Sequence, residues 1–429
     1  MKILALMENF NQILGLLIGL LYCYQVVYLA IGLLSRGRAR RARQAALHRY
    51  AVLISARNEE TVIGELIDSL KKQNYPSDLL DIYVVADNCT DHTAQVAQAA
   101  GATVYRRFNR VEVGKGYALD YLLKQLEADG YGECYSGYFI FDADNIVDPN
   151  FVSEMNKTFD TGEYVAVTGY RNSKNFGQNW VSAANSIWFL REARFVNAAR
   201  DALGLTCHVS GTGFLISAQV IRANGGGWPY HLLTEDLEFS AESAALGRKV
   251  GYCEGAIIYD EQPTSFRQSW DQRKRWAKGF CQVSAKHGLS LLKGTLKGGR
   301  RGMECYDIFM LIAPGNLLTL LGGSFQLVTI FGLLMAPDYA LKQALLLTVH
   351  FLGGAFASFY FSMLAFGVLT VASEWKVIRA KTWQKVVYLP LFPIFMLSYL
   401  PLTLTAIMQK KVEWKPIRHQ SMTQLDRAA

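Results

Sequence analysis

The chain has 429 residues, of which 51% are hydrophobic and 12% aromatic, and it carries a formal net charge of +8. This composition can build a large core, but four apolar stretches are each long enough to cross a bilayer of roughly 30 Å, which excludes a wholly soluble protein. Seven cysteines without a Cys-x-x-Cys pair favour reduced thiols and suggest no zinc site.

The apolar stretches are Phe10–Leu34, Tyr306–Leu334, Ala344–Ala372 and Val386–Met408. Charges follow the first stretch instead of preceding it, which indicates a retained anchor and not a signal peptide. Because this anchor is followed by Arg36, Arg38, Arg40, Arg41 and Arg43, the positive-inside rule predicts a cytosolic domain from position 36 onward. Positive charge concentrated beside apolar stretches favours contact with membrane lipids, and we expect no nucleic acid partner.

The predicted organisation is a catalytic domain inserted between transmembrane helices. The expected parts are an N-terminal span (1–35), a cytosolic α/β domain (36–265), interfacial amphipathic helices (266–304), a transmembrane bundle (305–408) and a basic tail (409–429). Three prolines interrupt Val386–Met408, so this stretch is either a single span or a re-entrant hairpin. Pro314-Gly315 could likewise divide Tyr306–Leu334 into an interfacial helix and a shorter span.

Short apolar runs alternate with helical patterns in the first half of the predicted domain. The expected strands are Tyr50–Ser55, Asp81–Ala86, Thr103–Arg106 and an apolar run from Tyr138 that ends at Asp142. Strands that alternate with helices predict a mostly parallel sheet with flanking helices. In such a sheet, ligands bind at the carboxyl ends of the strands.

Polar residues stand at these strand ends. They are Asn58 and Glu59, Asp87, Lys115 in Gly-Lys-Gly, and Asp142 and Asp144. We expect one site to collect them, and we expect Asn58 also to cap the helix that follows it. Asp142 and Asp144, two residues apart at a strand end, point the same way and could hold Mg²⁺ or Mn²⁺ between them, with coordination positions left for a diphosphate.

Three further segments lie between Trp180 and Asp236. The segment Trp180–Leu203 is interpreted as a core helix. The turn Gly211-Thr212-Gly213 allows close approach of the backbone to a ligand, or simply makes a turn. Thr234 is expected to cap a helix whose first turn contains Glu235 and Asp236.

A helix is predicted from Phe266 to about Leu292. It carries Gln272, Arg275 and Trp276, which suit a diphosphate clamp and a stacking surface for a sugar ring. The same pattern is also typical of an amphipathic helix on a membrane surface.

Taken together, these motifs resemble the family 2 membrane glycosyltransferases, which include cellulose, hyaluronan and poly-N-acetylglucosamine synthases. The matching residues are Asp87, Asp142-Ala-Asp144, Thr234-Glu235-Asp236 and Gln272-x-x-Arg275-Trp276. The resemblance implies a GT-A nucleotide-sugar-binding fold, a UDP-sugar donor, a metal cofactor and inversion at the anomeric carbon. Arg273 departs from the polar or aromatic residue that relatives often carry after the glutamine.

The resemblance also implies a role for each candidate residue. Asn58, Glu59 and Asp87 would contact the uridine. Lys115, Arg275 and Asp142 would serve the donor diphosphate, and Asp144 with Asp142 would hold the metal. Asp236 would be the general base. Gly211, Thr212, Glu235, Gln272 and Trp276 would face the acceptor.

Two enzyme functions fit these residues. The first is a processive polysaccharide synthase that extends a chain from UDP-sugars and exports it across the plasma membrane, as a multi-pass protein. The alternative is a non-processive transferase acting on a lipid acceptor. A transporter or an inactive sugar-binding protein is disfavoured, because the apolar stretches are nearly free of ionisable residues between their ends.

Overall fold

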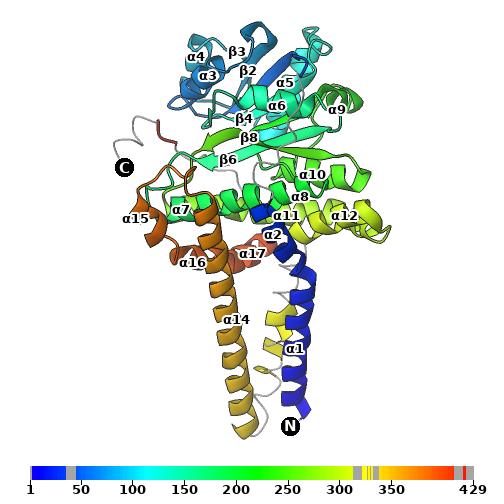
Figure 1. Ribbon diagram of the computed structural model, residues 1–429, viewed down its shortest axis with the longest axis vertical. Helices are drawn as coiled ribbons and strands as arrows, with labels where there is room; N and C mark the ends of the chain where they lie inside the picture. The colour runs from blue at the N-terminus through cyan, green and yellow to red at the C-terminus, as the bar shows by residue number, and fades with distance from the viewer. Residues whose placement is uncertain are drawn as a thin grey trace.

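The computed structural model describes residues 2–34, 45–312, 321–325, 327–328, 330–331, 338–409 and 419–421. The molecule has three levels: an α/β domain, a layer of helices beneath it, and two long helices that project away from that layer (Figure 1). The arginine cluster at 36–43, Pro314-Gly315 and most of the basic tail lie outside the described residues.

The strands form one mixed sheet of eight strands, in the order β3-β2-β1-β4-β7-β6-β8-β5. Their bounds are β1 (Tyr50–Ala56), β2 (Leu80–Asp87), β3 (Thr103–Arg107), β4 (Gly137–Asp142), β5 (Ile146–Val147), β6 (Ala166–Ser173), β7 (Phe214–Ser217) and β8 (Val250–Asp260). The first four strands are parallel, and β7 runs antiparallel to both β4 and β6. The predicted fold class, α/β with a mostly parallel sheet, is confirmed for these four strands.

The helices that pack on and below this sheet are bounded as follows. They are α3 (Ile63–Lys71), α4 (Thr93–Ala99), α5 (Lys115–Ala128), α6 (Phe151–Phe159), α7 (Trp180–Arg191), α8 (Ala198–Ala202), α9 (Ala218–Ala223), α10 (Glu235–Leu246), α11 (Phe266–Thr295), α12 (Gly299–Ile312), α15 (Thr382–Val387), α16 (Leu391–Leu397) and α17 (Tyr399–Met408). A 3₁₀ turn (η1, Ser77–Leu79) precedes β2, and a π-helical turn (η2, Glu192–Asn197) joins α7 to α8. The remaining helices are α1 (Lys2–Tyr22), α2 (Tyr24–Leu34) and α14 (Asp338–Ser373).

The sheet is buried on both faces, as its apolar strands require. In β1, Leu53 packs into the core on one face with residues of α5 and α7, whereas Val52 and Ile54 pack into the core on the other face with residues of α3 and α6. Each fully buried side chain of this kind contributes about 1.5–3 kcal/mol of transfer free energy. This two-sided burial fixes where β1, β2 and β4 end, and therefore where their loops lie.

Among the described residues, three segments are long and apolar enough to cross a membrane: Glu8–Leu34, Leu345–Ser373 and Leu391–Met408. The first covers most of α1 and all of α2, and the second is the greater part of α14; α1 and α14 project side by side from the base of the molecule (Figure 1). The third is divided at Ser398 into α16 and α17, and it runs across α1 and α14 instead of alongside them (Figure 1).

In the structure, the first part of the expected span Tyr306–Leu334 belongs to the helical layer. Residues Tyr306 to Ile312 are the end of α12, which packs against α10 and α11 and buries the carboxylate of Asp307. A buried carboxylate with protein partners belongs to the helical layer and not to a lipid-facing span. Of the rest of this stretch, the structure describes only short pieces.

Two predicted helix caps are not formed as the sequence analysis expected. The helix α3 begins four residues later than expected, after Val62, and no side chain caps it. Asn58 has a positive φ of 59° and its side-chain oxygen accepts a hydrogen bond from the Thr90 backbone, so it joins two loops instead. Thr234 does stand at the N-cap of α10, but its hydroxyl makes no capping bond.

Candidate active site

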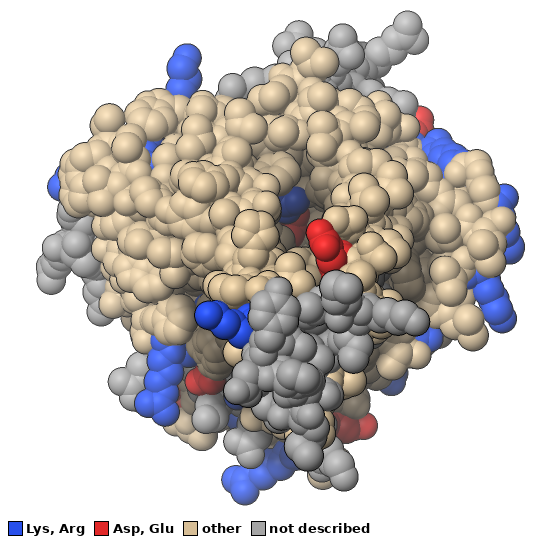
Figure 2. All heavy atoms as spheres, turned by 90° about the horizontal axis from the view of Figure 1, so that it is seen from below, with Lys and Arg blue, Asp and Glu red and all other residues tan. Residues whose placement is uncertain are grey.

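A cavity of about 310 Å³ lies at the carboxyl ends of β1, β2 and β4, which is within the size range of small-molecule sites. Its lining extends from Ser55 and Asp87 at one end to Leu311 and Tyr399 at the other. The first end belongs to the sheet and the second to the helical layer. Seen from below, the side from which α1 and α14 project, the surface is hollowed, and acidic and basic side chains are visible inside the hollow (Figure 2).

Most of the predicted site residues line this cavity. They are Glu59, Asp87, Lys115, Asp142, Asp144, Gly211, Glu235, Asp236, Gln272, Arg275 and Trp276. Asn58 lies in the loop contact described above. Thr212 is buried: its hydroxyl donates a hydrogen bond to Asn145 and accepts one from the Asp142 backbone, so it holds the Asp142 loop in place.

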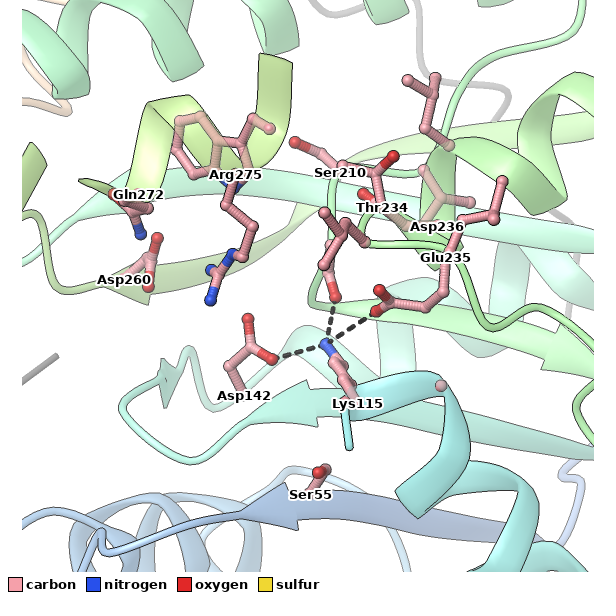
Figure 3. A pocket seen from close by; sticks show the side chains of 18 of the residues that line it. Ser55, Lys115, Asp142, Ser210, Thr234, Glu235, Asp236, Asp260, Gln272 and Arg275 are labelled. Atoms are coloured by element: carbon pink, nitrogen blue, oxygen red, sulfur yellow. Dashed lines mark hydrogen bonds and ion pairs between the residues drawn. The ribbon is translucent and has the colours of Figure 1, made fainter. Parts of the chain in front are cut away.

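Lys115, at the start of α5, lies at the centre of the cavity (Figure 3). Its ammonium donates hydrogen bonds to Asp142 Oδ1 and to the Gly211 carbonyl, both at 2.5 Å, and lies 3.9 Å from Glu235 Oε1. Burial would lower the pKa of Lys115, but Asp142 and Glu235 raise it above its ordinary value. The site therefore keeps a fixed positive charge between two carboxylates and a backbone carbonyl, which come from three different segments.

Glu235 and Asp236 form the first turn of α10, and both face the cavity. Burial raises the pKa of both carboxyl groups, while Lys115 opposes that rise. Gly211, with a φ of +79°, leaves room beside Asp236: a Cβ atom there would lie 3.6 Å from Asp236 Oδ2. A carboxylate with a raised pKa and open space beside it suits proton transfer near neutral pH.

The two carboxylates of the Asp-Ala-Asp motif have different neighbours. Asp142 pairs with Lys115, whereas Asp144 lies beyond the end of β4 with Asp260 and His419 as neighbours. Within the described part of the chain, no three His, Cys, Asp or Glu side chains are arranged to hold a metal ion by themselves. A cation here would take one or two protein ligands and complete its shell from a diphosphate and water, which is the usual arrangement for Mg²⁺ with nucleotide substrates.

The opposite end of the cavity carries Asp87. This carboxylate is buried, and Arg107 of β3 donates a hydrogen bond to it at 2.7 Å. The pairing compensates one oxygen and holds the side chain rigid, which suits recognition of a polar ligand by the other oxygen.

The helix α11 contributes the residues of the Gln-x-x-Arg-Trp motif. Gln272, Arg275 and Trp276 line the cavity together because positions three and four apart share one face of a helix. The guanidinium of Arg275 extends toward Asp142 and Lys115 (Figure 3). Arg273, on another face of this helix, is buried against Phe395 and donates a hydrogen bond to the Ser398 hydroxyl at 2.6 Å.

Sequence reasoning missed several lining residues. Arg171 of β6 pairs with Asp260 at the end of β8, and its guanidinium stacks 3.8 Å from the centre of the Phe189 ring. Glu192, in the π-helical turn, pairs with His208, which holds the pKa of Glu192 at about 2 although burial would raise it. Of these charged residues only Glu192 lies in Trp180–Leu203, which was interpreted as a core helix, and the charged residues of that segment were the available signal.

One end of the cavity is apolar. Its lining side chains come from α7, α11, α12 and α17 and are Trp188, Phe189, Trp276, Phe280, Leu311 and Tyr399. We call this set the aromatic mouth. It joins the polar centre of the site to the helical layer from which the long apolar helices extend.

Comparison with known proteins agrees with this architecture. A family model described as "Glycosyltransferase like family 2" matches residues 48–279, more than half of the chain. Among solved structures, a mannosyltransferase from Pyrobaculum calidifontis in complex with GDP-Man and Mn²⁺ superimposes with a TM-score of 0.54 at 15% identity, covering 91% of this chain and 98% of that one. The fold and the site together define a nucleotide-sugar glycosyltransferase with a GT-A-like domain. The chain belongs to glycosyltransferase family 2.

Two curated relatives differ in what they make. The chain is 28% identical over 236 residues to a beta-monoglucosyldiacylglycerol synthase from Synechocystis sp., covering 54% of this chain and 47% of the relative. It is 25% identical over 342 residues to a hyaluronan synthase from Streptococcus pyogenes, covering 75% and 78%. The chain thus spans about half the length of the cyanobacterial relative.

Proposed function

We propose that this chain transfers a single sugar from a UDP-sugar to the hydroxyl of a membrane lipid, with inversion and with a divalent cation. The observation that carries the proposal is the aromatic mouth, which opens the catalytic cavity toward the helical layer and the apolar helices. A lipid hydroxyl anchored in the membrane can enter there while a soluble donor binds among the polar residues at the strand ends. The similarity to a glycolipid synthase supports the same acceptor class.

The proposed mechanism assigns each step to a side chain in the cavity. Asp236 takes the proton from the acceptor hydroxyl as that oxygen attacks the anomeric carbon, a contribution of roughly 10²–10⁴ in rate. Lys115 and Arg275 neutralise the negative charge that develops on the departing diphosphate. A divalent cation held at Asp144 would supply further charge neutralisation at the diphosphate. A single inversion requires no covalent intermediate.

Product analysis tests this proposal. The purified protein in lipid nanodiscs is incubated with Mn²⁺, a panel of radiolabelled UDP-sugars and diacylglycerol or glycolipid acceptors. We expect label to appear in a lipid that gains one sugar, detected by thin-layer chromatography and mass spectrometry. Label in a water-soluble chain of many sugars, measured by gel filtration, would overturn it.

Processive polysaccharide synthesis is the second candidate. It is favoured by the match to a hyaluronan synthase across most of both chains and by Trp276, on which a growing chain end could stack. If this function is correct, a stable Trp276→Ala variant should make shorter polymer while still hydrolysing donor. The same product assay distinguishes the two candidates.

A further inference from the structure

The proposed mechanism gives no role to Glu192, although this carboxylate lines the catalytic cavity beside the aromatic mouth. Glu192 opens the π-helical turn η2, and Trp188 and Phe189 of the mouth lie on the last turn of α7, four and three residues before it. Residues three and four apart share one face of a helix, so the carboxylate lies on the same side of the cavity as the two aromatic rings.

Hydrogen bonds orient Glu192 and keep it ionised. Arg200 donates a hydrogen bond to His208 Nδ1, and because a guanidinium only donates, the proton of this imidazole lies on Nε2. Nε2 lies 3.2 Å from Glu192 Oε1 and donates to it, and the Ser210 hydroxyl donates to the same carboxylate. Burial raises the pKa of Glu192, but the contacts with His208 and Ser210 hold that pKa at about 2. Glu192 is therefore negatively charged near neutral pH.

The surroundings of Glu192 define what it can bind. An ionised carboxylate attracts either a cation or a neutral hydrogen-bond donor. Arg171, Lys115 and Arg275 line the same cavity and would repel a cationic headgroup. Hydroxyl groups are neutral and donate, and the aromatic rings of the mouth suit the apolar faces of a sugar or a similar polyol. A headgroup with several hydroxyls therefore matches this part of the cavity.

The short segment Ser210-Gly211 connects Glu192 with the proposed base. Ser210 bonds to Glu192, and a Cβ atom on the next residue, Gly211, would lie 3.6 Å from Asp236 Oδ2. Both carboxylates line the cavity. Because Gly211 has no side chain to separate them, two hydroxyls of one headgroup can reach the two carboxylates together.

We propose that Glu192 is an acceptor-binding residue, whose carboxylate accepts a hydrogen bond from a second hydroxyl of the lipid headgroup while Asp236 takes the proton from the first. The oxygen of the first hydroxyl bonds to the anomeric carbon, and UDP leaves with the electrons of the broken carbon–oxygen bond. The second hydroxyl does not react. The acceptor is then a lipid with a polyol headgroup, such as one that already carries a sugar, and not diacylglycerol, which has a single hydroxyl. This inference rests on the proposed function and narrows its acceptor class.

Acceptor selectivity tests the proposal. The full chain in lipid nanodiscs receives Mn²⁺ and the UDP-sugar that the product analysis identifies. The quantity measured is kcat/KM for monoglucosyldiacylglycerol divided by kcat/KM for diacylglycerol. We expect Glu192→Gln to lower this ratio about three- to tenfold, because a hydrogen bond to a charged acceptor is about twice as strong as one to a neutral acceptor. A merely structural role would lower both values together and leave the ratio as it is.

Monodeoxy forms of the acceptor sugar test the wild type without any substitution. The form that lacks the attacked hydroxyl cannot react. Among the others, the form that lacks the hydroxyl bound by Glu192 should show a kcat/KM lower by about 10- to 150-fold, because it leaves a buried charge without its partner. Equal kcat/KM for all the remaining deoxy forms and the parent glycolipid would overturn the proposal.

Glu254→Gln is the matched control for Glu192→Gln. Glu254 pairs with Arg194 of the same π-helical turn but lies outside the cavity lining, so the selectivity ratio should stay within about twofold of the wild type. An unchanged ratio in Glu192→Gln, or a wild type that uses diacylglycerol at least as well as the glycolipid, would also overturn the proposal. Absence of transfer to any lipid by the wild type would instead contradict the proposed function, and with it this inference.

Discussion

At the scale of single residues, Lys115 controls the charge of the catalytic cavity. Its ammonium touches Asp142 and the Gly211 carbonyl and lies near Glu235. An ammonium so placed favours the ionised form of each nearby carboxyl group, against the effect of burial. When a diphosphate binds, this ammonium can exchange part of its hydrogen bonding within the protein for bonds to the phosphate oxygens. Lys115 therefore binds the donor and also sets the ionisation of the neighbouring carboxyl groups.

The role of Asp236 predicts a separation of chemistry from binding. Asp236→Asn should lower the transfer rate by roughly 10²–10⁴, because the amide cannot accept the acceptor proton, while UDP affinity measured by calorimetry stays the same. Asp78→Asn, at an exposed position outside the cavity, is the control. A parallel loss of UDP affinity would move Asp236 to a donor-binding role.

The pH dependence of the reaction should report the raised pKa of Asp236. Only the ionised carboxylate accepts a proton, so the rate should rise with pH through that pKa, above the range of an ordinary aspartate. Because Lys115 opposes the effect of burial, Lys115→Met should shift this acid limb to still higher pH, measured as kcat at saturating donor.

Lys124→Met is the matched control for this shift. Lys124 lies on the same helix and pairs with Asp120 on the surface, so its loss should leave the acid limb unchanged. An acid limb that stays in place in Lys115→Met would contradict the proposed coupling.

At the scale of elements, a buried charge cluster joins the N-terminal apolar helices to the domain. Arg200 of α8 donates two hydrogen bonds to Asp307 of α12, at 2.7 and 2.9 Å, and Tyr28 of α2 donates one to the same carboxylate at 2.6 Å. The three side chains are almost fully buried. Breaking a buried pair leaves an uncompensated charge, whereas replacing both partners by apolar groups does not.

This cluster predicts a specific pattern of stability. Asp307→Ala should lower the free energy of unfolding by about 3–5 kcal/mol, because Arg200 stays buried without its partner. Tyr28→Phe removes one hydrogen bond to a charged group and should cost about 1.5–3 kcal/mol. The double variant Arg200→Met/Asp307→Leu should be more stable than Asp307→Ala in detergent unfolding experiments. Equal losses in the double and single variants would contradict the argument.

The strand-helix units near the N-terminus of the domain were predictable, and the later segments were less so. The strand β1 was predicted to within one residue, because a two-sided core demands a continuous apolar run that ends where the polar loop begins. The residues at these strand ends could be assigned to one site for the same reason. Arg171, Glu192 and His419 could not be assigned to the site, since each is placed there by partners in other structural elements.

At the scale of the whole molecule, the catalytic cavity has one end suited to a water-soluble substrate and one end suited to a substrate in lipid. Its polar end lies against the sheet, and its aromatic mouth lies in the helical layer. The donor is soluble and the proposed acceptor is anchored in lipid, so one cavity with two chemically different ends lets each substrate arrive from its own phase. The site thus depends on how the domain sits on its apolar helices as much as on the motif residues.

From the position of the aromatic mouth we predict that a substitution there impairs use of the acceptor and leaves use of the donor unchanged. Leu311→Trp should fill the mouth and lower kcat/KM for a lipid acceptor, while hydrolysis of the donor by water continues. Leu296→Trp is the control, because Leu296 is 81% exposed and outside the cavity. If Leu311→Trp lowered both rates equally, the mouth would not be the acceptor entrance.

The cavity also has a consequence for biosynthesis, because it is lined by residues from both Ser55 and His419. At about 5–20 residues per second, a ribosome adds these two residues roughly 20 to 70 s apart. The α/β sheet can fold during that interval, but its catalytic cavity is incomplete until the helical layer and the tail have been synthesised. A nascent chain still emerging from the ribosome therefore lacks a finished cavity and should not consume nucleotide sugar before its C-terminal helices and tail have been synthesised.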